Sequence, residues 1–171
     1  MADRLAGKSA LISGGASGLG EAQAILYARE GAAVLIGDVQ ADKGNAVVAA
    51  IESEGGKAAF IHLDVSDVAS WNAAVADAVA RFGKLTTLVN NAGIFHPGGI
   101  ATETKDGWDR MIAINQTGVF LGMKAATPAL LASGNAAIVN VSSLYGLIGS
   151  PNAISYHASK AAVRVRGKGG G

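Results

Sequence analysis

The chain has 171 residues, half of them hydrophobic, and a formal net charge of +1. This length and this hydrophobic share predict one globular domain with a buried core, and they exclude a disordered chain. Because the 14 basic residues nearly balance the 13 acidic ones, no strong field attracts nucleic acid or an anionic membrane surface. A small molecule is therefore the expected partner.

Missing residue types narrow the possibilities further. The chain has no Cys, which excludes disulfides and thiolate metal sites, and its three His residues lack the spacing of zinc ligands. The first four residues lack the charged-then-apolar pattern of a signal peptide, and no apolar run approaches the roughly 18 residues of a membrane span. We therefore expect a soluble, cytoplasmic protein without a metal site.

Strand-like and helix-like patterns alternate along the chain. Apolar runs predict strands over residues 8–13, 33–38, 58–65, 85–90 and 136–142. Helical patterns occupy residues 21–30, 40–54, a segment capped by Ser66 and ended by Gly83, and 108–131, and a last helix starts near Tyr156. Since parallel strands need crossover helices, this alternation predicts an α/β fold with a doubly wound parallel sheet.

A glycine-rich segment, Ser13-Gly14-Gly15-Ala16-Ser17-Gly18-Leu19-Gly20, joins the first strand to the first helix. Backbone N–H groups and the positive end of a helix can hold a pyrophosphate at such a turn, and glycines let the phosphates approach closely. The alternative is a tight turn that binds nothing.

Asp38 ends the second predicted strand, 18 residues after Gly20. An acid at a spacing of about 20 residues hydrogen-bonds the adenosine ribose in dinucleotide-binding folds. By itself Asp38 could equally be a solvated loop acid or a helix cap. Together with the glycine turn it favours dinucleotide binding, so residues 1–163 are predicted to form a Rossmann domain that carries the active site.

The end of the chain has a different character. Residues 164–171 contain only Arg, Val, Lys and Gly and lose all apolar periodicity. We expect an irregular, basic, glycine-rich tail that cannot continue the preceding helix. Such a tail is typical of an artificial chain end or of translation in the wrong reading frame.

These motifs resemble those of the classical short-chain dehydrogenases/reductases, whose glycine motif Thr-Gly-x-x-x-Gly-x-Gly is matched here with Ser13 in place of Thr. The resemblance runs in order from residue 5 to about residue 163, with one departure at Thr86, where many members have Asp. Further matching motifs are Asp64-Val65, Asn90-Asn91-Ala92-Gly93, Asn115, Ser143 and Tyr156-His157-Ala158-Ser159-Lys160.

The resemblance implies an NAD-dependent oxidoreductase acting on alcohols or ketones. The implied catalytic residues are Asn115, Ser143, Tyr156 and Lys160. The implied cofactor-binding residues are Gly14, Ser17, Gly18, Leu19, Gly20, Asp38, Asp64, Val65, Asn91, Ala92, Gly93, Tyr156 and Lys160.

Chemistry explains why these residue types are needed. A hydride leaving an alcohol carbon requires a base for the hydroxyl proton, but a free Tyr phenol, with a pKa near 10, is a poor base at neutral pH. Lys160 follows Tyr156 by four residues, so both face one way on a helix and the ammonium favours the phenolate. By resemblance, Ser143 donates to the substrate oxygen and Asn115 holds a water that relays the proton.

Other interpretations of single residues remain open. Asn115 could simply bond a neighbouring loop, and His96 is better explained as a loop residue than as part of the site. His157 does not indicate a hydrolase triad, because no Gly-x-Ser-x-Gly elbow exists and the acids are distant.

Two further functions also remain open: a catalytically incompetent NAD-binding fragment and an NADPH-dependent 3-oxoacyl reductase. Family members continue beyond Lys160 through two more strands and a substrate loop. We therefore expect a C-terminally incomplete fold with an exposed fifth strand, whereas a full-length member would be a homodimer or homotetramer.

Two finer expectations concern specificity. The Asp38 carboxylate predicts NAD over NADP, because it would repel a ribose 2′-phosphate. The segment Val141 to Ala162 resembles cyclic-alcohol and hydroxysteroid dehydrogenases. In this fold, six side chains would surround the reacting carbon: Ile94, Phe95, Leu144, Tyr145, Leu147 and Ile148. They predict a mainly apolar pocket, suited to neutral secondary alcohols or cyclic ketones rather than sugars or acids.

Overall fold

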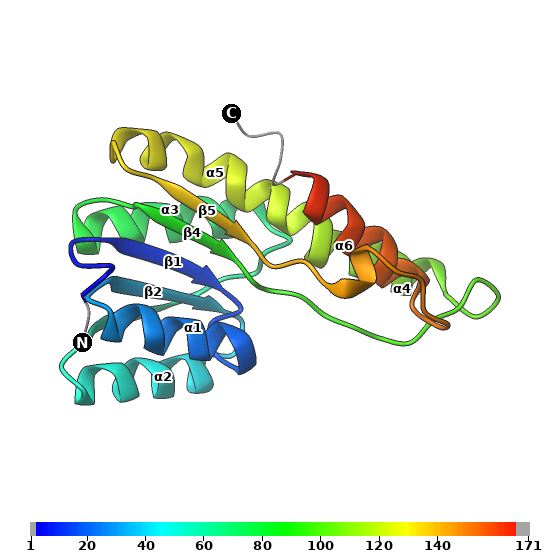
Figure 1. Ribbon diagram of the computed structural model, residues 1–171, viewed down its shortest axis with the longest axis horizontal. Coiled ribbons are helices and arrows are strands. Elements are labelled where there is room, and N and C mark those ends of the chain that lie inside the picture. The colour runs from blue at the N-terminus through cyan, green and yellow to red at the C-terminus, as the bar shows by residue number, and fades with distance from the viewer. Residues whose placement is uncertain (1–2, 167–171) are drawn as a thin grey trace.

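A parallel sheet of five strands, in the order β3-β2-β1-β4-β5, forms the centre of the molecule (Figure 1). The computed structural model describes residues 3–166. The strands are β1 (Ser9–Ser13), β2 (Ala33–Asp38), β3 (Lys57–His62), β4 (Thr87–Asn90) and β5 (Ala137–Asn140). The predicted α/β parallel sheet is confirmed, although the third and fifth strands end earlier than predicted, where their pairing with β2 and β4 stops.

Helices cover both faces of the sheet, as a doubly wound fold requires (Figure 1). α1 (Gly18–Arg29) and α2 (Ala41–Ser53) pack on one face, and α3 (Val68–Phe82) and α5 (Gly118–Ala132) pack on the other. α4 (Lys105–Ile112) and α6 (Ile154–Arg166) lie side by side beyond the carboxyl ends of the strands. Within residues 3–166, no helix has the length and hydropathy needed to cross a membrane.

The start of α3 corrects a sequence prediction. Asp67, and not Ser66, caps the helix, because its carboxylate accepts hydrogen bonds from the N–H groups of Ala69 and Ser70 at 3.3 and 2.8 Å. Two amide donors suit a carboxylate, which has two acceptor oxygens. Gly83 ends the helix with φ of +77°, as predicted.

The long predicted helix of residues 108–131 is three consecutive segments. Thr104 caps α4 by accepting a hydrogen bond from the Gly107 N–H at 3.0 Å, so the helix starts before the predicted Trp108. A five-residue π-helix, Ala113–Thr117, then separates α4 from α5 and contains Asn115. Such π-turns inside helices often occur at functional sites.

The expectation that the last helix does not continue into residues 164–171 is wrong for the part of this tail that the structure describes, residues 164–166. α6 extends to Arg166. Neither Arg nor Val prevents helix propagation, and Arg is a good helix former. The remainder of the predicted tail, residues 167–171, lies outside the described residues.

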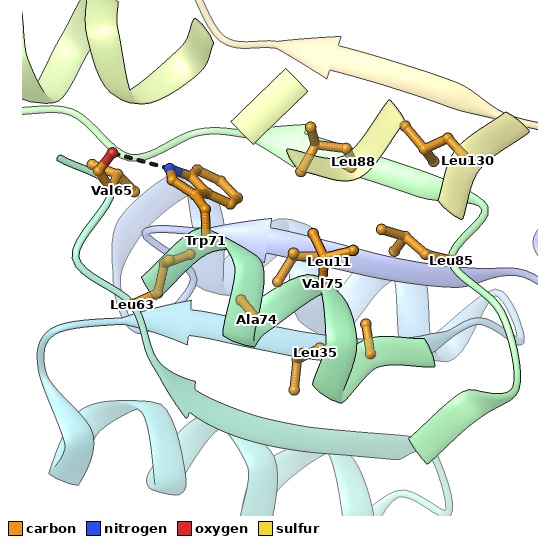
Figure 2. Close-up of a cluster of buried hydrophobic side chains, with 12 residues drawn as sticks. Leu11, Leu35, Leu63, Val65, Trp71, Ala74, Val75, Leu85, Leu88 and Leu130 are labelled. Atoms are coloured by element: carbon orange, nitrogen blue, oxygen red, sulfur yellow. Dashed lines mark hydrogen bonds between the residues drawn. The ribbon is translucent and has the colours of Figure 1, made fainter. Parts of the chain in front are cut away.

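A buried cluster on the α3 side of the sheet supports the site (Figure 2). Trp71 on α3 is 1% exposed and packs with Leu11, Leu63 and Leu88 in this cluster. Its indole N–H also donates a hydrogen bond to the carbonyl oxygen of Val65 at 3.0 Å. The core therefore holds the backbone that follows β3, at the carboxyl edge of the sheet.

Candidate active site

A groove of about 420 Å³ opens at the carboxyl ends of the strands, beside β1 and β4, where the strand order reverses. Ligands of open α/β sheets bind at this kind of reversal point. Predicted cofactor-binding residues that line the groove are Gly14, Ser17, Leu19, Asp38, Asp64, Val65, Asn91, Ala92 and Gly93. The glycine turn, the end of β2, the Asp64-Val65 pair and the segment after β4, which are far apart along the chain, thus converge on one groove. The other predicted cofactor-binding residues, Gly18, Gly20, Tyr156 and Lys160, are not among its lining residues.

The glycine turn is shaped for close packing and for an anion. A Cβ at Gly14 would lie 2.8 Å from the Ala92 Cα, and one at Gly20 would lie 2.0 Å from the Gly14 carbonyl oxygen, so side chains are excluded at both positions. Ser17 precedes α1 in extended conformation and makes no side-chain capping bond. The first amides of α1 are therefore left for a ligand such as a phosphate.

Asp38 has a structural role in the same groove. One carboxylate oxygen accepts a hydrogen bond from the Ala16 N–H at 3.1 Å, and the other accepts one from the Gln40 N–H at 3.0 Å. Asp38 is 7% exposed and lines the groove. It therefore ties the glycine turn to the end of β2 and keeps lone pairs available for ribose hydroxyls.

The Asn91 side chain fastens β4 to the glycine turn. Its Nδ2 donates hydrogen bonds to the carbonyl oxygens of Ser13 and Gly14 at 3.1 and 3.0 Å. In return, the Ser13 hydroxyl oxygen accepts hydrogen bonds from the N–H groups of Asn91 and Ala92, both at 3.2 Å. Ser13 thus performs a fastening role at the place where the family motif has Thr.

Asp64 lies at the far wall of the groove. It accepts hydrogen bonds from the Ser66 hydroxyl at 2.7 Å and from the Ser66 N–H at 2.9 Å. These bonds, the hydroxyl first, lower the pKa of Asp64. Ser66, expected to cap a helix, therefore holds this acid in its ionised form.

Lys160 on α6 is 4% exposed, and its ammonium donates to the carbonyl oxygen of Val141, just after β5, at 2.9 Å. Burial lowers the pKa of Lys160. A Cβ at Gly93 would lie 3.4 Å from Lys160 Nζ and 3.3 Å from Asn115 Oδ1. Gly93 also lines the groove. The cofactor groove therefore borders the predicted catalytic residues Lys160 and Asn115 at Gly93.

Tyr156 lies one helical turn before Lys160, whose Nζ is 5.8 Å from the centre of the Tyr156 ring. The rings of Phe95 and Tyr145 meet the Tyr156 ring edge-on, with centroid distances of 5.2 and 6.1 Å. The predicted base is thus flanked by aromatic side chains from two loops.

Ser143 caps a short 3₁₀ turn, η2 (Leu144–Gly146), by accepting a hydrogen bond from the Tyr145 N–H at 3.2 Å. Its hydroxyl proton is not used by that bond and can be donated to a ligand oxygen.

Asn115 bonds a neighbouring loop, which was the alternative interpretation of this residue. It is 0% exposed, its Oδ1 accepts a hydrogen bond from the Ile94 N–H, and its Nδ2 donates one to the Ile94 carbonyl oxygen, both at 2.8 Å. The side chain therefore holds the loop after β4. The proton-relaying water that the resemblance implies at Asn115 stays a prediction.

His96 and His157 both make contacts with loops. His96 Nε2 lies 3.0 Å from a carboxylate oxygen of Glu103, in agreement with its interpretation as a loop residue. His157 contacts backbone atoms of Tyr145 and Ser150. Among the residues described, no group of three or more His, Cys, Asp or Glu side chains could hold a metal ion.

Thr86, the departure from the family pattern, makes its own contact. Its hydroxyl accepts a hydrogen bond from the Ser9 N–H and donates one to the Ser9 carbonyl oxygen, both at 3.0 Å. A hydroxyl can do both, whereas an ionised carboxylate only accepts. Thr86 therefore joins the start of β1 to the segment before β4.

Sequence reasoning missed part of the groove wall. Arg110 on α4 and Ile114 in the π-helix line it together with Gln40 and Leu63. Arg110 and Ile114 are four residues apart and so share a helix face, and Ile114 directly precedes Asn115. This spacing is the signal that could have identified them.

The fold and the groove define a dinucleotide-binding protein of the Rossmann class, with a Tyr-Lys pair on a helix beside the groove. The family model of short chain dehydrogenases matches residues 8–166. The chain belongs to this family, whose members bind a nicotinamide cofactor.

Characterised relatives agree with this assignment. The chain is 58% identical, over 98% of its length and 67% of the relative's, to the 2,5-dichloro-2,5-cyclohexadiene-1,4-diol dehydrogenase LinX of Sphingobium indicum. It is 48% identical, over 94% of its length and 64% of the relative's, to the trans-4-hydroxycyclohexanecarboxylate dehydrogenase of Sinomonas cyclohexanicum.

A solved structure of a short-chain dehydrogenase/reductase from Burkholderia xenovorans superposes with a TM-score of 0.90 at 35% identity, covering 94% of this chain and 66% of that one. The chain thus spans about two thirds of the length of the proteins that it matches.

Proposed function

We propose that this protein is an NAD-dependent oxidoreductase that interconverts a secondary alcohol and a ketone on a small ring-containing molecule. The observation that carries the proposal is the junction at Gly93, which borders the groove and lies against both Lys160 and Asn115. A cofactor in the groove would therefore end beside the predicted catalytic residues. The names of two relatives, a cyclohexadienediol dehydrogenase and a hydroxycyclohexanecarboxylate dehydrogenase, support a ring alcohol.

In this proposal the glycine turn and the start of α1 hold the cofactor's pyrophosphate, and Asp38 receives its adenosine ribose hydroxyls. When bound, the cofactor supplies the hydride acceptor. Tyr156 takes the hydroxyl proton during alcohol oxidation and returns a proton during ketone reduction. Ser143 donates a hydrogen bond to the substrate oxygen, and the buried Lys160 ammonium stabilises negative charge on the Tyr156 oxygen.

Cofactor preference gives the first prediction. We expect kcat/KM for NAD to exceed that for NADP by at least about tenfold, because the Asp38 carboxylate repels a ribose 2′-phosphate. Asp38→Asn keeps the shape of the side chain and removes its negative charge. This variant should lower the ratio of kcat/KM for NAD to kcat/KM for NADP. Steady-state rates with both cofactors measure it, and equal or better use of NADP by the unmodified protein contradicts the assignment.

Substrate class gives the second prediction. The apolar side chains Phe95, Leu144, Leu147 and Ile148 are each more than half exposed, and Phe95 meets the Tyr156 ring edge-on. In the proposed function these side chains receive a hydrocarbon ring. We expect a higher kcat/KM for cyclohexanol than for glucose, measured by NADH formation. A preference for glucose would overturn this substrate class.

Two alternatives are separated by the same assays. NADH binding, followed by fluorescence, without turnover of any alcohol would identify an incompetent NAD-binding fragment. A preference for NADPH, with reduction of a 3-oxoacyl thioester, would identify an acyl reductase. The main proposal also includes a small-molecule partner, a cytoplasmic location and, for a full-length form, a homo-oligomer. Gel filtration measures the oligomeric state.

A further inference from the structure

The loop over residues 143–151, here called the 143–151 loop, runs from the end of β5 towards α6 and carries the predicted Ser143. Its apolar side chains Leu144, Leu147 and Ile148 are 61, 56 and 51% exposed. The packing of these three side chains therefore contributes little to holding this loop in place. Its position depends on its polar contacts and on the partly buried Tyr145, whose ring contacts His157 and Tyr156.

His157 makes the main polar contacts to the far part of the loop. Its Nε2 accepts a hydrogen bond from the Ser150 N–H at 2.9 Å and also lies 3.0 Å from the Ser150 carbonyl oxygen. Its Nδ1 lies 2.6 Å from the carbonyl oxygen of Tyr145. Because a backbone N–H only donates, Nε2 is the acceptor of the Ser150 bond, and the protonated Nδ1 donates a hydrogen bond to the carbonyl oxygen of Tyr145.

Ring contacts continue this connection to the predicted base. The Tyr145 ring lies against the His157 ring at a centroid distance of 5.2 Å and meets the Tyr156 ring edge-on at 6.1 Å. His157 directly follows Tyr156 in the chain, so one helical turn carries both the base and the anchor of the loop beside it.

The near part of the loop is held separately. The Ser142 hydroxyl donates to the Lys160 carbonyl oxygen at 2.7 Å, and a Cβ at Gly146 would lie 2.8 Å from the same oxygen. These contacts keep Ser143 next to α6 without His157. Loss of the His157 bonds should therefore move Tyr145 and the apolar side chains more than it moves Ser143.

We propose that His157 is a positioning residue: through Tyr145 and Ser150 it sets the 143–151 loop as the wall of the substrate pocket beside Tyr156. This inference rests on the proposed function for its consequence, which is tight binding of the ring substrate. It assigns His157 no part in proton transfer, because its two nitrogens are engaged by loop backbone atoms.

Three variants test the inference. His157→Phe keeps a flat ring against Tyr145 and removes both hydrogen bonds, whereas His157→Gln retains an amide oxygen able to accept from the Ser150 N–H. Ser53→Ala is the control, because it removes only an exposed hydroxyl that bonds the Ala50 carbonyl oxygen on α2, outside the groove and the 143–151 loop. The readouts are kcat and KM for cyclohexanol and hydrogen exchange of the Ser150 amide.

We expect His157→Phe to raise KM about tenfold while kcat stays within about threefold, and to speed exchange at Ser150. His157→Gln should recover part of both changes, and Ser53→Ala should match the unmodified protein. A fall in kcat at unchanged KM would mean that the ring only stabilises the fold and would overturn the inference, as would unchanged exchange at Ser150. If the unmodified protein oxidises no alcohol, the proposed function fails, and faster exchange in His157→Phe still supports the anchoring of the loop.

Discussion

Tyr156→Phe should lower the rate of alcohol oxidation by about 10²–10⁴, because a lost general base typically costs that much. Cofactor affinity should change little, since the substitution leaves the glycine turn and Asp38 intact. Phe also keeps the ring that Phe95 and Tyr145 contact edge-on, so the local packing is preserved. Steady-state NADH formation measures the rate, and fluorescence titration with NADH measures the affinity.

Lys160→Ala provides the contrast to this variant. Lys160 is buried and bonds the backbone after β5, and the family resemblance also implies that it binds the cofactor. Rate and cofactor affinity should therefore fall together. Both variants are best made in the 171-residue chain and in a version extended with the C-terminal third of a relative. If the extended Tyr156→Phe protein keeps most of its rate, Tyr156 is not the base.

Trp71→Ala should destabilise the protein by about 3–5 kcal/mol, the usual cost of removing a large buried aromatic side chain. Trp71 is 1% exposed in the cluster between α3 and the sheet, so the substitution leaves a cavity (Figure 2). Urea unfolding followed by circular dichroism measures the change. NADH affinity should fall as well, because Trp71 holds the carbonyl of Val65, a residue that lines the groove.

Trp71→Phe separates the effect on stability from the effect on NADH affinity. It retains much of the apolar volume and removes the N–H that bonds Val65, so it should cost less stability than Trp71→Ala, about 1–3 kcal/mol. We expect its NADH affinity still to be reduced. Unchanged stability in Trp71→Ala would contradict the central place given to this side chain in the core.

By itself the sequence determined the order of strands and helices and the residues at the carboxyl ends of the strands. These depend on local patterns: apolar runs predict strands, Asp38 ends one of them, and glycines and Asn91 directly follow others. Because the strands are parallel, their carboxyl ends meet at one edge, and the motifs therefore converge on one groove.

Only the tertiary structure decided which partners the polar side chains bond. Asn115 bonds Ile94, 21 residues away, and His157 bonds Tyr145, 12 residues away, so neither contact appears in any local pattern. Ser66 and Asp67 are both good helix caps, and the position of Asp64 decides that Ser66 bonds it instead. Hydrogen bonds require partners within about 3 Å, and such distances between remote residues are fixed only once the sheet and helices have packed.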